Sequence, residues 1–169
     1  MKDKMDFVLT DGATLLGGRG ITDYAICGMG GELIADIICR APHLKDREIN
    51  LILQPMSRQA HLRRYLAREG FEVKGESYSF DQGKYYVCLM AAYTGVCRDI
   101  DEIEAECGNP SSVFIGDKAR QGYLKTLLAA RERALRGKML GGVSDIPEEK
   151  VIKGLKELLS ETQNKGETV

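Results

Sequence analysis

The fold is decided by the stretch Ile26-Cys27-Gly28-Met29-Gly30-Gly31-Glu32-Leu33-Ile34. An apolar run ends in closely spaced glycines, and apolar residues then recur at helical spacing through Ile37 and Ile38. This order predicts a buried strand, a tight turn and a helix. Glycines let a backbone approach a ligand closely, and open α/β sheets bind ligands at the carboxyl ends of their strands. From the residues alone, close packing and ligand binding explain the turn equally well.

Two strand patterns and a second helix pattern lie on either side of this stretch. Residues 7–10 predict a short strand before it, and residues 49–53 predict a continuous apolar strand after it. Such a strand is typical of a parallel sheet with helices on both faces. Ser57 is expected to cap the next helix, which ends at Gly70. These patterns predict an α/β fold.

The second half of the chain changes its pattern twice. Residues 71–80 and 85–93 predict two strands joined by a tight turn, an antiparallel hairpin that closes the sheet. From Asp99 onward the pattern is helical, with two leucine-rich stripes separated by Gly141-Gly142 and a cap at Ser144 or Asp145. Two helices with a short connection predict an antiparallel pair. We expect a sheet domain over residues 1–98 and a helical extension over residues 99–169.

Composition narrows the class of protein. The 169 residues are 43% hydrophobic and 29% charged, which is typical of a soluble globular protein. No segment approaches the roughly 20 apolar residues that span a bilayer, and the first residues lack the apolar core of a signal peptide. The five cysteines form no C-x-x-C pair, and the two histidines have no partner at metal-ligand spacing. We expect no metal site and no membrane association.

Charge is unevenly distributed along a chain whose net charge is −1. Basic residues gather in segments 57–68 and 118–138, whereas acidic residues gather near 99–106. Such segregation suits a polyanionic partner, but it also describes a solvated helix face. Charge alone favours the solvated face.

Segment 25–34 resembles the AGMGG-x-LI signature of the TrmK family of bacterial tRNA adenine-N1 methyltransferases. Further matches follow in the family's order, at 51–55, at 62–66 with Gly70-Phe71, and at Lys84-Tyr85-Tyr86. The resemblance extends from Phe7 onward. A dinucleotide-binding motif fits this stretch poorly, because Leu33 stands where that motif has its third glycine and Gln54 ends the following strand where an acid is expected.

The resemblance implies a Rossmann-like class I methyltransferase domain with a C-terminal helical hairpin, in a cytoplasmic enzyme. It also implies S-adenosyl-L-methionine as the methyl donor and N-1 of a tRNA adenine as the acceptor. The segment beside the methyl group and the base would be Gly28, Met29, Gly30 and Gly31. The cofactor-binding residues would be Asp11, Gly12, Cys27, Gly28, Gln54 and Pro55. The tRNA phosphates would be contacted by Arg58, Arg63, Arg64, Lys118, Arg120, Lys125, Arg131 and Arg133.

The chain departs from the family's pattern in three places. Cys27 replaces an alanine, and Met56 replaces an asparagine. The family also begins with a glycine-rich turn that holds the donor's methionine part and a strand whose terminal acid holds its ribose. Nothing before Phe7 resembles either element, so we expect an N-terminally truncated member.

Three expectations follow from the truncation. We expect the isolated chain to be an inactive methyltransferase. The alternative is a non-catalytic RNA-binding remnant of such an enzyme. A sheet without its first strands also exposes an edge and an apolar face, which predicts a homo-oligomer.

Overall fold

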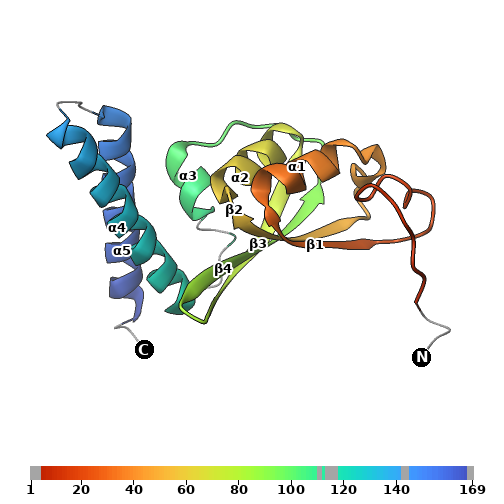
Figure 1. The fold of residues 1–169 in the computed structure, drawn as a ribbon, viewed down its shortest axis with the longest axis horizontal. Helices are drawn as coiled ribbons and strands as arrows, with labels where there is room; N and C mark the ends of the chain where they lie inside the picture. The colour runs from red at the N-terminus through yellow and green to blue at the C-terminus, as the bar shows by residue number, and fades with distance from the viewer. Residues whose placement is uncertain (1–4, 110–111, 113–117, 142–144, 167–169) are drawn as a thin grey trace.

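The structure is a computed structural model that describes residues 5–109, 112, 118–141 and 145–166. Within these residues the sheet has four strands, in the order β1 (Asp23–Gly30), β2 (Asn50–Ser57), β4 (Lys84–Tyr93) and β3 (Phe71–Asp81) (Figure 1). β1 and β2 are parallel, whereas β4 is antiparallel to both of its neighbours. The expected sheet with a closing hairpin is confirmed.

Two helices lie on one face of this sheet (Figure 1). They are α1 (Gly31–Cys39) and α2 (Gln59–Arg68), and a short 3-10 helix η2 (Pro42–Leu44) follows α1. The strand side chains on this face form the core, with Tyr24, Ile26, Leu51, Leu53, Leu89 and Ala91 buried. Ile34, Ile38, Leu62 and Leu66 pack onto them from the helices. Of the predicted apolar stripe of α1, the three isoleucines Ile34, Ile37 and Ile38 form the core, whereas Leu33 is 46% exposed.

The opposite face of the sheet is open in the described part of the chain. Ala25 and Cys27 are exposed, and Ile52 and Met90 keep 38% and 47% of their surface accessible. The register places Ala25 beside Ile52 and Ile52 beside Met90, so these side chains form one row. The expectation of helices on both faces is wrong for these residues, because α1 and α2 cover the same side.

The predicted strand at residues 7–10 is wrong. These residues have no regular secondary structure, and Phe7 and Leu9 are 91% and 98% exposed. The segment runs away from the sheet toward the N-terminus (Figure 1). A strand is stable only when a neighbour satisfies its backbone hydrogen bonds, and β1 is not paired with this segment.

The β3–β4 hairpin closes with two residues. Asp81 pairs with Lys84, which leaves Gln82 and Gly83 in the turn, with φ angles of 46° and 80°. Positive φ at both central positions is typical of the type I′ turn, whose twist matches that of the strands. The predicted tight turn is confirmed.

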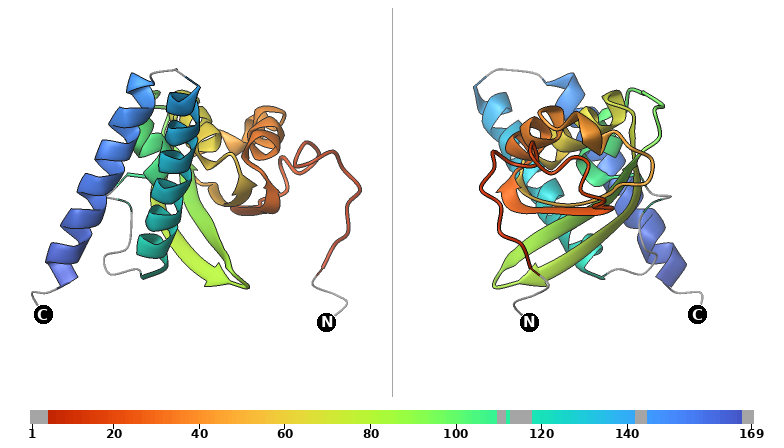
Figure 2. Two further views of the ribbon diagram at one scale, coloured as in Figure 1. Left: turned by 60° about the vertical axis from the view of Figure 1, so that its left-hand side comes forward. Right: turned by 90° about the vertical axis from the view of Figure 1, so that its right-hand side faces the viewer.

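From α3 (Glu102–Cys107) onward the described chain is helical, as expected from Asp99 onward. α3 precedes two long helices, α4 (Lys118–Leu140) and α5 (Ile146–Gly166), which pack against each other beside the hairpin end of the sheet (Figure 2). Leu124, Val151 and Leu155 form their buried interface together with Cys107. The backbone N–H of Glu148 donates to Asp145 Oδ1 at 3.1 Å, so Asp145 caps α5. Ser144 lies outside the described residues.

A buried ion pair fastens α3 to the sheet. Arg63 of α2 binds Glu76 of β3 through two hydrogen bonds of 2.8 and 2.7 Å, and both side chains are almost fully buried. Arg63 also donates to the carbonyl oxygens of Ala105 and Glu106 in α3. The hydroxyl of Tyr78 donates to Glu76 at 2.8 Å. One buried cluster therefore connects α2, β3 and α3.

Candidate functional site

The two motifs singled out in the sequence meet at one edge of the sheet. β1 and β2 run parallel, with Cys27 beside Gln54, and the register shifts between Cys27 and Met29. The backbone N–H of Gly28 donates to Gln54 Oε1 at 2.9 Å. We call residues 27–31 and 54–55 the strand rim. The structure brings these predicted site residues together.

Two glycines of the strand rim are required for different physical reasons. Gly28 has a φ of 78°, a conformation that side-chain-bearing residues rarely adopt, and the space beside it is open. Gly31 begins α1, and a Cβ added there would lie 2.4 Å from the carbonyl oxygen of Arg58. Close packing therefore explains Gly31, whereas Gly28 leaves an accessible backbone next to the exposed Cys27 and Met29.

The β2 end continues into an unusual helix start. Ser57 belongs to β2 and pairs with Gly30, so the prediction that Ser57 caps α2 is wrong. The residue at the helix start is Arg58, in the left-handed conformation with a φ of 58°, and its side chain makes no capping hydrogen bond. Met56, which stands in place of the asparagine of the TrmK pattern, lies next to Gln54, with Gln54 Nε2 3.4 Å from Met56 Sδ.

Asp11 and Gly12 do not lie at the strand rim. Asp11 forms a 2.5 Å ion pair with Arg40, at the C-terminal end of α1, and Gly12 contacts Ile37 in the last turns of that helix. α1 begins at the rim and has nine residues, so its far end lies about 13 Å away along the helix axis. The structure therefore does not bring these two predicted cofactor-binding residues to the strand rim. Without a formed strand at residues 7–10, nothing holds their loop at the rim.

The predicted phosphate-binding residues divide into three groups. The first group, Arg63 and Arg120, is buried, with exposed fractions of 3% and 9%. Arg63 is bound to Glu76, so its predicted role in tRNA contact is wrong. Three others lie near the surface in ion pairs: Arg58 with Glu32, Arg64 with Glu102, and Arg131 with Glu106 and Glu148. Lys118, Lys125 and Arg133 are exposed on α4 and have no ion pair among the described residues.

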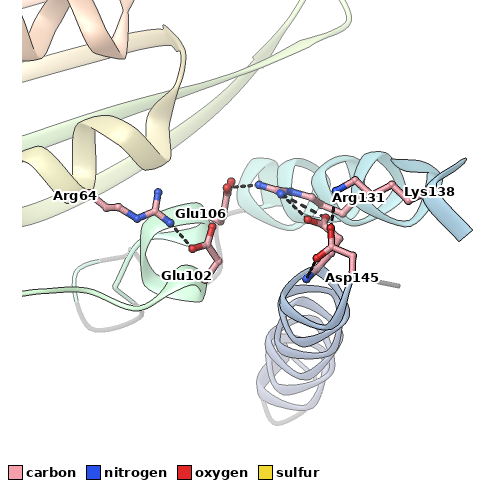
Figure 3. Close-up of polar contacts among 7 residues, drawn as sticks. Arg64, Glu102, Glu106, Arg131, Lys138 and Asp145 are labelled. Carbon is pink, nitrogen blue, oxygen red and sulfur yellow. Dashed lines mark hydrogen bonds and ion pairs between the residues drawn. The ribbon is translucent and has the colours of Figure 1, made fainter. Parts of the chain in front are cut away.

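Figure 3 shows acidic side chains that form ion pairs with basic residues of α2 and α4. Arg64 of α2 reaches Glu102 of α3, and Arg131 of α4 reaches Glu106, while Lys138 of α4 reaches Asp145 at the start of α5. The hydrogen bond from Lys138 lowers the pKa of Asp145. The acidic helix α3 thus neutralises basic residues of both neighbouring helices. These pairs hold the helical half together.

A cavity that the sequence did not reveal lies next to the strand rim. Its volume is about 480 Å³, and it lies between the end of β2, the hairpin tip and α4. We call it the tyrosine pocket and define it by Pro55, Met56, Lys84, Tyr85, Tyr86 and Tyr123. The only sequence signal for it was the Lys84-Tyr85-Tyr86 match.

The described part of the chain contains no group of three or more His, Cys, Asp or Glu residues placed to hold a metal ion. None of its helices is long and apolar enough to cross a membrane.

A family model described as "Methyltransferase domain" matches residues 1–89, which is more than half of the chain. The chain belongs to this methyltransferase family. The match ends within β4 and includes the whole strand rim. Comparison with curated proteins gives no match.

Solved structures confirm the Rossmann-like fold of the methyltransferase domain. A protein of the NADB-Rossmann superfamily from Streptococcus agalactiae is 27% identical, with a TM-score of 0.73. The match covers 94% of this chain and 69% of the Streptococcus agalactiae protein. A putative tRNA (m1A22) methyltransferase from Streptococcus pneumoniae, in complex with S-adenosyl-L-methionine, is 24% identical, with a TM-score of 0.71. The match covers 94% of this chain and 70% of that protein. TrmK from M. capricolum, in complex with S-adenosyl-homocysteine, is 17% identical, with a TM-score of 0.60. The match covers 93% of this chain and 66% of that protein.

Proposed function

We propose that this methyltransferase chain supplies the acceptor side of an S-adenosyl-L-methionine-dependent enzyme that methylates N-1 of a tRNA adenine in the cytoplasm. The observation that carries the proposal is the strand rim, where Gly28 exposes its backbone beside Gln54 and Pro55. The structural neighbours described as tRNA methyltransferases support the substrate. In this proposal residues 1–98 form the partial catalytic domain and residues 99–169 the extension that holds tRNA.

The strand rim suits methyl transfer to a ring nitrogen. The donor supplies an electrophilic methyl group, and the adenine nitrogen already has a lone pair, so the protein mainly has to position the reactants. Gly28 and Met29 would lie beside the methyl group and the base, with Cys27, Gln54 and Pro55 against the donor. Gln54 would keep the Gly28 backbone in place through its 2.9 Å hydrogen bond.

The described residues fit one side of the donor. β1 is an outer strand of the described sheet, and Cys27, Gly28 and Met29 are exposed along it. Ligand sites normally enclose 70–90% or more of a bound small molecule. One exposed wall cannot do so, and we infer that the isolated chain is inactive.

Calorimetric titration of the 169-residue chain with S-adenosyl-L-methionine tests this proposal. We expect a dissociation constant above about 1 mM, because one wall provides less than about 4 kcal/mol of binding free energy. Saturable binding near micromolar would contradict the inferred inactivity, and methylation of tRNA by the same sample would then establish the enzyme. Weak donor binding in the millimolar range agrees with the proposal, whereas a folded sample with no donor binding at all would favour the second candidate. That candidate is an RNA-binding remnant that uses the exposed Lys118, Lys125 and Arg133.

We also propose that the chain forms a homo-oligomer through the β1 edge and the open sheet face. Light scattering at micromolar concentration is expected to give at least twice the mass of one chain. Ile52→Lys places a charge in the apolar row of Ala25, Ile52 and Met90 and should give a monomer. The control is Met139→Lys, which changes a 59% exposed residue on α4 and should leave the mass unchanged. A monodisperse wild-type monomer would contradict this part of the proposal.

A further inference from the structure

The tyrosine pocket has a wall of ordered aromatic rings. The Tyr85 ring packs against Phe80, with ring centroids 4.7 Å apart, and the ring of Tyr123 packs against Tyr78 at 5.3 Å. Tyr85 also lies close to α4, because a Cβ added at Gly122 would be 2.1 Å from its hydroxyl oxygen. The absence of a side chain at Gly122 lets the ring reach the helix. Two of the three tyrosines are therefore held in position before any ligand arrives.

The third tyrosine is the ring that remains available. Tyr86 lines the pocket and is half-buried, and it stacks on no other ring in the described part of the chain. Pro55 and Met56 line the same cavity, directly after Gln54 of the strand rim. A planar ligand in this cavity would thus lie next to the strand rim.

The charge around the tyrosine pocket is positive. Its lining contains Lys84 and no carboxylate. Ala130 of α4 lines the cavity, and the exposed Arg133 follows three residues later, on the same side of the helix. Asp81 lies opposite Lys84 in the backbone register of the hairpin, but their side chains form no ion pair in the described structure. Aromatic rings flanked by cations are typical of single-stranded nucleic-acid sites, where bases stack and phosphates meet lysine or arginine.

We propose that the tyrosine pocket binds a nucleobase of the substrate RNA that neighbours the methylated adenine. The base stacks on Tyr86, and Lys84 and Arg133 contact the phosphates on either side of it. A volume of about 480 Å³ lies within the usual range for ligand sites. The inference rests on the proposed function for the identity of the ligand as RNA. It adds a specificity site outside the strand rim.

The test measures fluorescence anisotropy of a labelled single-stranded RNA hexamer with the full chain. Tyr86→Ala is expected to weaken binding about 5- to 150-fold, the range measured when a stacking aromatic is removed. Tyr86→Phe keeps the ring and should bind as the wild type does. An abasic hexamer should bind equally to the wild type and to Tyr86→Ala, because both then rely on phosphate contacts alone. Thermal unfolding of Tyr86→Ala confirms that the variant is folded.

A second pair of variants tests the charges independently of Tyr86. Lys84→Ala is expected to reduce the slope of log affinity against log salt by about 1. Lys153→Ala removes the same charge from an exposed site on α5 and should leave the slope unchanged. Equal slopes for both variants would overturn the role of Lys84.

The outcomes separate this inference from the proposed function. Complete absence of donor binding, even in the millimolar range, together with Tyr86-dependent RNA binding would refute the proposed donor site and keep the tyrosine pocket. Methylation of tRNA together with unchanged hexamer binding by Tyr86→Ala would keep catalysis and overturn the pocket. Absence of any RNA binding by the folded wild type would also overturn the pocket.

Discussion

Replacing Glu76 with alanine is expected to lower the free energy of unfolding by about 3–5 kcal/mol. The substitution leaves Arg63 charged and 3% exposed, with no carboxylate to compensate it. Burial disfavours the charged form of Arg63, but the carboxylate of Glu76 more than offsets this and raises the arginine's pKa above its ordinary value. Arg63 also donates to the carbonyl oxygens of Ala105 and Glu106. If the Arg63 side chain became disordered, α3 would lose these hydrogen bonds to α2. Urea denaturation measures the change.

Glu72→Ala is the matched control for Glu76→Ala. Glu72 lies on the same strand and pairs with Lys74, but both side chains are exposed, so the expected loss is below about 1 kcal/mol. The double substitution Arg63→Met with Glu76→Leu should recover most of the stability, because an apolar pair of similar size needs no charge compensation. Similar losses for Glu76→Ala and Glu72→Ala would refute the view that burial makes the Arg63–Glu76 pair important.

Replacing Gly31 with alanine is expected to lower the free energy of unfolding by about 1–3 kcal/mol. The added Cβ would lie 2.4 Å from the carbonyl oxygen of Arg58 and 3.0 Å from that of Ser57. Both atoms belong to the backbone, which cannot rotate away as a side chain can. The start of α1 and the turn between β2 and α2 must therefore separate. Thermal or urea unfolding monitored by circular dichroism measures the loss.

Gly137→Ala is the control for Gly31→Ala. Gly137 lies inside α4, and a Cβ added there meets no atom within 4 Å. Alanine costs less conformational entropy than glycine in a helix, so this variant should gain about 0.4–1 kcal/mol. Opposite signs for the two variants are the expected result. A Gly31→Ala variant as stable as the wild type would show that the rim can widen without cost.

Much of the local structure was predictable from short-range patterns. The i, i+3, i+4 spacing of Ile34, Ile37 and Ile38 predicted α1, and the turn residues Gln82 and Gly83 predicted the hairpin. The convergence of Gly28 with Gln54 was predictable as well, because parallel strands end at the same edge of a sheet. Each of these features depends on residues near one another in the chain or on one simple rule of topology.

The errors came from partners that are distant in the sequence. Arg63 and Arg64 belong to a basic stretch that suggested phosphate contact, but Glu76 lies 13 residues and Glu102 38 residues further along. Residues 7–10 have a strand-like composition but no paired neighbour in the described structure. The tyrosine pocket joins β2, β4 and α4, and no single motif contains all three.

From residue 23 onward, the sequence by itself determined the element types, the hairpin turn, the two helical stripes and the glycine turn at the strand rim. These follow from periodicity and backbone conformation, which act within a few residues. Only the tertiary structure decided that Arg63 is buried and that Lys118, Lys125 and Arg133 remain exposed. It also decided that Asp11 lies at the far end of α1 and that three tyrosines share one cavity. The physical reason is that burial and charge compensation depend on which surfaces meet in space.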